Sequence, residues 1–139
     1  MSDSTQPLDV SPLVRAVARL AEGLERHRKE PQDEQLRDGL IQRFEFTYEL
    51  SHRMLRRYLR TAVASPDEID QMSFQDLVRT ASRQGLLCGD WPAWRRFREM
   101  RTRTSHTYSE SIAEQVAAGV PDFLTEAAYL RDRLQQRLA

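Results

Sequence analysis

The sequence LRDGLIQRFEFTYELSHRMLRRYL, residues 36–59, has the periodicity of one long helix. Its apolar side chains recur every three or four residues on one face, namely Leu36, Leu40, Ile41, Phe44, Tyr48, Leu55, Tyr58 and Leu59. Three further apolar side chains widen that face, namely Phe46, Leu50 and Met54. A helix with so broad an apolar face is expected at the centre of a bundle or at a contact with a second chain.

A shorter amphipathic helix is predicted ahead of this central one. Ser11 and Pro12 form a start signal, because Ser caps helices and Pro suits their first position. One apolar stripe follows, made of Leu13, Val17, Leu20 and Leu24. We expect residues 1–12 to form a flexible tail and residues 13–139 to form one helical domain.

Two start signals follow the central helix. Residues 65–68, Ser-Pro-Asp-Glu, have the spacing of a capping box and predict a short helix. Ser73 is expected to cap a further helix that ends near Gln84. Gly85 then stands where a helix terminus requires a residue that tolerates positive φ.

The remaining sequence predicts two more helices, from about residue 90 to 107 and from Glu110 to Leu138. Gly119 and Pro121 should bend or break the last helix. No segment has the alternation of a β-strand. The predicted fold is therefore all-α, an up-and-down four-helix bundle with a short extra helix in the crossover.

Composition excludes several classes of protein. The chain has 139 residues, of which 40% are hydrophobic and 30% charged, and its formal net charge is zero. A single cysteine, Cys88, excludes an intrachain disulfide framework and a zinc cluster built on cysteines. No apolar run reaches the ~18 residues of a membrane span, and no secretory signal begins the sequence. We therefore expect a soluble, cytoplasmic protein without membrane association, metal or cofactor.

The basic residues are unevenly distributed. Twenty arginines accompany one lysine, Lys29, a bias that genome base composition alone can produce. Residues 91–108 hold five arginines and one acid: Arg95, Arg96, Arg98, Arg101, Arg103 and Glu99. Such a segment is either an ordinary solvated helix face or a surface that binds phosphate groups.

The segment RTRTSHTY, residues 101–108, carries the strongest candidate site. On an ideal helix of about 100° per residue, His106 points away from the core stripe that contains Phe97, and Arg101 lies on its flank. Three neighbours also point outward, namely Arg95, Arg98 and Thr102. This is either an ordinary surface or a site for phosphate chemistry, where imidazole moves protons and guanidinium stabilises negative charge.

Other candidate sites are weaker. Glu45 and Glu49 are a carboxylate pair spaced i,i+4, and Glu49 is also i,i+4 with Arg53, which predicts ion pairing. His27 and His52 are isolated in the sequence. The two tryptophans, Trp91 and Trp94, are expected to anchor the core or an interface rather than to stack on nucleic acid bases.

Three motifs in order give a family resemblance. They are IQRFEFTYEL at residues 41–50, Gly-Leu-Leu at residues 85–87 followed by a Trp, and Ser-His-Thr-Tyr at residues 105–108. Together they resemble the small HEPN-domain proteins of the HepT type, also described as nucleotidyltransferase substrate-binding proteins. The resemblance extends from about Leu13 to Leu138.

The resemblance implies a helical bundle that dimerises and a minimal nucleotidyltransferase partner encoded nearby. In the toxin–antitoxin members the HEPN protein is a metal-independent ribonuclease that acts on RNA, and the nucleotidyltransferase is the antitoxin. Their catalytic Arg and His correspond to Arg101 and His106 and face each other across the dimer. The tyrosine that the partner modifies with AMP corresponds to Tyr108. Nearby side chains would support RNA or nucleotide binding, namely Thr102, Arg98, Arg103 and Arg95.

One residue departs from the family pattern. The position after the arginine usually holds Asn, and here it is Thr102, which lacks the paired donor and acceptor of an amide. Two alternatives to the ribonuclease therefore stay open. One is a non-catalytic subunit that binds a nucleotide or another anionic substrate for the nucleotidyltransferase, and the other is a purely structural protein.

Overall fold

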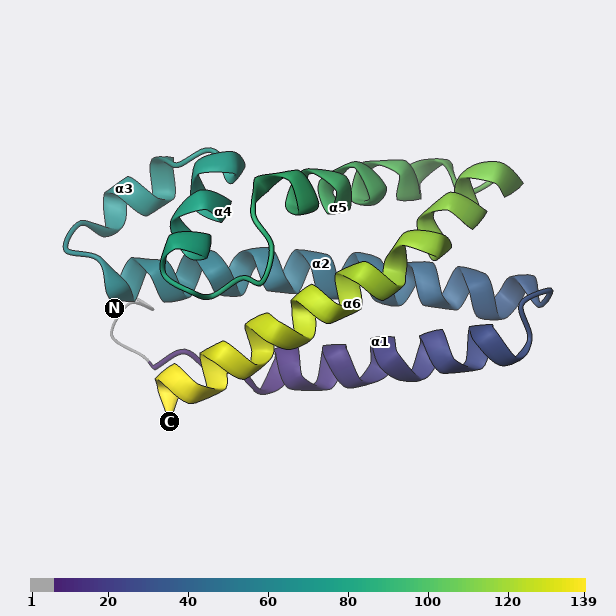
Figure 1. Cartoon of the computed structure of the whole chain (residues 1–139), viewed down its shortest axis with the longest axis horizontal. Coiled ribbons are helices and arrows are strands. Elements are labelled where there is room, and N and C mark those ends of the chain that lie inside the picture. The colour runs from purple at the N-terminus through teal and green to yellow at the C-terminus, as the bar shows by residue number, and fades with distance from the viewer. Residues whose placement is uncertain (1–6) are drawn as a thin grey trace.

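The computed structural model describes residues 7–139, and within this range every regular element is helical. The elements are α1 (Ser11–Lys29), α2 (Glu34–Ala62), α3 (Pro66–Gln71), α4 (Phe74–Arg83), α5 (Trp91–Arg103), the 3₁₀ turn η2 (Thr104–His106) and α6 (Glu110–Leu138). The four longest helices, α1, α2, α5 and α6, run alternately up and down, with α3 and α4 in the crossover between α2 and α5 (Figure 1). The predicted all-α bundle is confirmed, and its crossover contains two short helices.

An aromatic cluster at the centre of the bundle joins α2, α5 and α6. The ring of Phe123 on α6 packs edge-on against Phe44 of α2 at 5.0 Å and against Phe97 of α5 at 5.3 Å. Trp94 packs against Phe97 at 5.5 Å and is fully buried. Edge-to-face contacts of this kind add to the free energy of burying the rings. The broad apolar face of residues 36–59 is thus covered by helices of the same chain along most of its width.

Helix ends follow local rules. The carboxylate of Asp33 caps α2 by accepting from the backbone N–H groups of Gln35 and Leu36, a cap that the apolar pattern did not reveal. The hydroxyl of Ser73 accepts from the N–H of Asp76 at 3.1 Å and caps α4 as predicted. Gly85 has a φ of 77°, in the left-handed region that ends α4.

The N-terminal segment differs from the predicted tail. Helix α1 begins at Ser11, whose N–H donates to the carboxylate of Asp9 at 2.9 Å. Leu8 is only 9% exposed and belongs to the core. The last two residues of the tail predicted over residues 1–12 thus belong to α1. Residues 1–6 lie outside the described part of the chain.

Gly119 and Pro121 were expected to bend or break the last helix, and α6 continues without a break through Pro121. Gly119 lies against α5, because a Cβ added there would approach Met100 Sδ to 2.6 Å. The glycine thus permits close packing of α6 on α5. Within residues 7–139 no helix combines the length and the apolar character that crossing a membrane requires.

Candidate functional site

Helix α5 places the arginine-rich segment on the surface. Asp90 caps its start by accepting from the N–H of Trp91 at 2.8 Å, and Pro92 occupies its first turn. Trp94 and Phe97 anchor one side of the helix in the core. The arginines on the other side are consequently directed to solvent or to neighbouring helices.

Arg101 is held by two carboxylates of α2. Its Nε donates to Glu49 Oε1 at 2.9 Å, and its Nη2 lies 2.7 Å from the same oxygen. Its Nη1 lies 3.5 Å from Glu45 Oε2 and donates to the hydroxyl of Thr104 at 3.0 Å. The guanidinium therefore makes two hydrogen bonds, from Nε and from Nη1, and ion pairs with both carboxylates. The predicted ion pairing of Glu45 and Glu49 is confirmed, but the partner is Arg101 rather than Arg53.

The helix ends three residues before His106, so the prediction that α5 reaches about Thr107 was wrong. Residues 104–106 form a 3₁₀ turn, in which the hydroxyl of Thr104 donates to the carbonyl of Arg101 at 2.6 Å. Thr107 donates in the same way to the carbonyl of Thr104 at 3.3 Å. Hydroxyl groups that bond to nearby backbone compete with the helical ladder, which accounts for the early end.

The turn exposes the two side chains that carry the predicted chemistry. His106 is exposed, and Tyr108 is 86% exposed. Their rings lie edge to face with centroids 6.0 Å apart. Neither ring packs into the core of its own chain, in agreement with the outward orientation that the sequence predicts for His106.

Arg101 and His106 lie close in sequence, yet no hydrogen bond joins them among the described residues. The two residues bracket the end of α5, five positions apart. The structure thus brings a half-exposed guanidinium and an exposed imidazole to one end of the bundle, with Tyr108 beside them.

The remaining predicted side chains differ in their surroundings. Thr102 donates its hydroxyl to the carbonyl of Arg98 at 3.1 Å rather than to His106. Arg103 donates to Gln115 on α6 at 3.0 Å. Arg98 lies over the ring of Phe74 at 5.7 Å. Arg95 pairs with Glu99 at 3.4 Å, six residues before Arg101, and so belongs to the edge of the site.

His52 lies next to Arg98 at the site, and the sequence analysis did not identify it as a site residue. Its ring lies 4.5 Å from that of Phe74, the same ring that Arg98 covers, and its Nε2 lies 3.4 Å from a guanidinium nitrogen of Arg56. Burial, followed by the positive charge of Arg56, lowers the pKa of His52 below its usual value. The signal in the sequence was its spacing of three residues from Glu49, which puts both on one face of α2.

The described residues contain no group of three or more His, Cys, Asp or Glu side chains placed to hold a metal ion. The arrangement can bind anions and transfer protons. Arginines supply forked donors for phosphate oxygens, and an imidazole can act as a general acid or base.

Comparisons with known proteins agree with the motifs and with the fold. The family model for proteins described as nucleotidyltransferase substrate binding protein like matches residues 8–136. A Haemophilus influenzae relative named probable ribonuclease HepT is 44% identical over 99 residues, which make up 71% of this chain and 67% of that protein.

A solved structure from Haemophilus influenzae, HI0074, superposes with a TM-score of 0.85 and 35% sequence identity. The match covers 91% of this chain and 99% of that one, which is described as showing the fold of a substrate-binding domain of a nucleotidyltransferase. The resemblance drawn from the three sequence motifs is confirmed. The chain belongs to the HepT-like family of nucleotidyltransferase substrate-binding proteins, and its fold is that of a HEPN domain.

Proposed function

We propose that this protein is a metal-independent endoribonuclease whose catalytic groups are Arg101 and His106. The observation that carries the proposal is the end of α5, where an exposed imidazole and a half-exposed guanidinium flank one turn. Support comes from the relative named probable ribonuclease HepT, which is 44% identical over its matched residues.

The side chains suit transesterification within RNA. A ribose 2′-oxygen attacks the adjacent phosphorus, and the bond from phosphorus to the 5′-oxygen breaks. His106 accepts the proton of the 2′-hydroxyl or supplies a proton to the departing 5′-oxygen. Arg101 donates to the phosphate oxygens, whose negative charge grows in the transition state. The products are a 2′,3′-cyclic phosphate and a 5′-hydroxyl.

The complete site is expected to need two copies of the chain. A two-fold dimer brings both ends of α5 into one groove, so that Arg101 of one protomer faces His106 of the other. The absence of an Arg101–His106 hydrogen bond within the described residues is consistent with such an arrangement. Arg95, Arg98 and Arg103 then add positive charge along the path of the RNA.

A nucleotidyltransferase is the proposed partner and regulator, as antitoxin to this toxin. Its target is the hydroxyl of Tyr108, which is 86% exposed. That oxygen attacks the α-phosphorus of ATP, pyrophosphate leaves, and AMP remains on the tyrosine. A bulky anion beside His106 then blocks RNA by volume and by charge.

A second candidate function is a non-catalytic subunit that binds a nucleotide or another anionic substrate for the nucleotidyltransferase. One observation favours it, because the matched structure is described as a substrate-binding domain. This function predicts calorimetric nucleotide binding that Arg101→Ala abolishes, without turnover of RNA.

Cleavage of RNA in EDTA separates the two functions. Wild type should cut, whereas His106→Ala and Arg101→Ala should each lose about 10²-fold or more in rate. His27→Ala is the matched control, because it removes a histidine elsewhere on the bundle. Normal cutting by His106→Ala would refute the nuclease assignment, and nucleotide binding without cutting by wild type would establish the substrate-binding subunit.

A further inference from the structure

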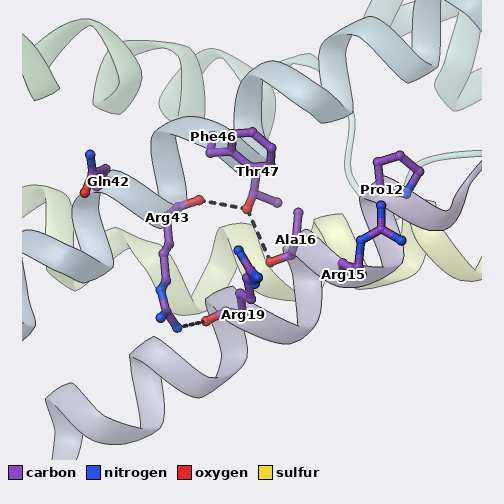
Figure 2. Close-up of a pocket in the computed structure, with 8 residues that line it drawn as sticks. All are labelled: Pro12, Arg15, Ala16, Arg19, Gln42, Arg43, Phe46 and Thr47. Atoms are coloured by element: carbon purple, nitrogen blue, oxygen red, sulfur yellow. Dashed lines mark hydrogen bonds between the residues drawn. The ribbon is translucent and has the colours of Figure 1, made fainter.

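A groove between α1 and α2 lies outside the site at the end of α5. Its volume is about 380 Å³, within the usual range of ligand pockets of roughly 300–1,000 Å³. Arg15 and Arg19 project from α1, and Arg43, Phe46 and Thr47 come from α2 (Figure 2). None of these residues has a part in the proposed chemistry.

An aromatic ring borders this groove. Phe46 is 58% exposed, although it lies on the central helix of the bundle. Beside it, Thr47 is buried and donates its hydroxyl to the carbonyl of Arg43 at 2.7 Å, so the floor has no free hydroxyl there. A ligand therefore meets an apolar surface with one large ring available for stacking.

The charge of the groove comes from α1. The guanidinium of Arg43 is engaged, since it donates to the carbonyl of Arg19 at 2.7 Å (Figure 2). It also lies 3.8 Å from Glu22. Arg15 and Arg19 are exposed and stand one helical turn apart. Within residues 7–139 no carboxylate lies within 4 Å of either guanidinium, so both can bind an anion.

We propose that this groove is a second subsite for single-stranded RNA. Arg15 and Arg19 bind backbone phosphates, and the ring of Phe46 stacks on a base. Positive side chains that follow the backbone, combined with exposed aromatic rings, are the usual means by which proteins hold single strands without sequence preference. The inference rests on the proposed function in taking RNA as the substrate.

The groove and the Arg101 site both use residues of α2. Glu45 and Glu49, which contact Arg101, stand one residue before and three residues after Phe46. At about 100° per residue, Glu45 and Phe46 lie on adjacent faces of the helix. A strand that reaches Arg101 can therefore cross α2 and place a neighbouring nucleotide in the groove.

Binding of a short, fluorescently labelled single-stranded RNA tests the inference, with anisotropy as the readout. All proteins carry His106→Ala, so that cleavage does not interfere. The variants are Arg15→Ala with Arg19→Ala, Phe46→Ala, and Phe46→Leu, which keeps an apolar side chain without a ring. Arg79→Ala with Arg83→Ala is the control, because these arginines are also exposed and spaced i,i+4, on α4. Light scattering follows the oligomeric state of each protein.

The double α1 variant should bind RNA about tenfold more weakly than the control. Its plot of log affinity against log salt concentration should become shallower by about 0.7 for each phosphate that the variant no longer binds. Both Phe46 variants should bind roughly five- to hundredfold more weakly, as expected for a stacked base. An unchanged oligomeric state alongside these weaker affinities supports the subsite.

Affinities equal to the control would overturn the subsite, even if wild type cleaves RNA normally. Weaker binding that occurs only where light scattering shows a dimer falling apart would also overturn it, because the groove would then be covered by a second copy. If wild type fails to cleave RNA but binding depends on Arg15, Arg19 and Phe46, the subsite stands and the proposed catalytic function fails.

Discussion

The guanidinium of Arg101 on α5 is bonded along one edge to a single carboxylate oxygen of Glu49 on α2, at 2.9 Å from Nε and 2.7 Å from Nη2. Glu45 lies 3.5 Å from its Nη1. The three side chains together carry one excess negative charge, and a phosphate that binds Arg101 must approach N–H groups that do not donate to Glu49 or Thr104. Under the proposed function, Glu49 would orient Arg101 and also oppose the binding of RNA.

Replacement of Glu49 by Gln separates these two effects. The variant should bind RNA several-fold more tightly, because one negative charge close to the phosphate is gone. Its kcat should fall about tenfold, because the guanidinium is less well fixed. Steady-state kinetics with a defined RNA measures both parameters. A variant with kcat and KM both at wild-type values would show that Glu49 does not position Arg101.

Replacement of Arg101 by Lys tests whether the fork of the guanidinium matters. Lysine keeps the charge but cannot contact Glu49, Thr104 and a phosphate with one planar group. We expect kcat/KM to fall about 10²-fold. The free energy of unfolding should change by no more than about 1 kcal/mol, since the pair is partly exposed. If the Lys variant had the wild-type kcat/KM, Arg101 would contribute only its positive charge.

His52 gives the folded protein a specific dependence on pH. Burial and Arg56 lower its pKa in the folded state, whereas the unfolded chain has a value of about 6.5. As the pH falls from that value through the lowered pKa, the unfolded state binds more protons and the folded state loses stability.

His52→Gln removes this contribution while keeping a group that can accept from Arg56. Chemical denaturation of both proteins at several pH values should show wild type losing stability, relative to the variant, as the pH falls below about 6.5. Parallel stability curves for the two proteins would show that His52 titrates normally.

Phe97 couples the core to the site, because it anchors α5 against Phe123. Phe97→Ala should reduce the free energy of unfolding by about 3–5 kcal/mol, as for other buried aromatic side chains. Urea denaturation provides the measurement. A decrease below about 1 kcal/mol would mean that α5 does not depend on this aromatic packing.

The sequence predicted the parts of this molecule that local rules determine. The periodicity of residues 36–59, the cap at Ser73 and the positive φ of Gly85 all depend on neighbours within a few residues. The outward orientation of His106 follows from helical geometry alone, and it survives the change from α-helix to 3₁₀ turn.

The partners of Arg101 could not be predicted in this way. Glu49 stands 52 residues from Arg101 in the sequence. The ion-pair partner that its i,i+4 spacing predicted was Arg53, on the same helix. Whether Arg53 or Arg101 pairs with Glu49 depends on how α5 packs on α2. The same limit applies to the groove, because Arg19 and Phe46 meet only when α1 and α2 pack side by side.

The products formed from one defined RNA in EDTA show whether Arg101 and His106 act as a catalytic pair. Mass spectrometry of the wild-type reaction should show fragments with 2′,3′-cyclic phosphate and 5′-hydroxyl ends, and His106→Ala should form none above background. The same RNA with a 2′-deoxy sugar at the cleaved position should stay intact, because the attacking oxygen is missing. Fragments with 3′-hydroxyl and 5′-phosphate ends, or equal cleavage by His106→Ala, would contradict the assignment of Arg101 and His106 as a catalytic pair.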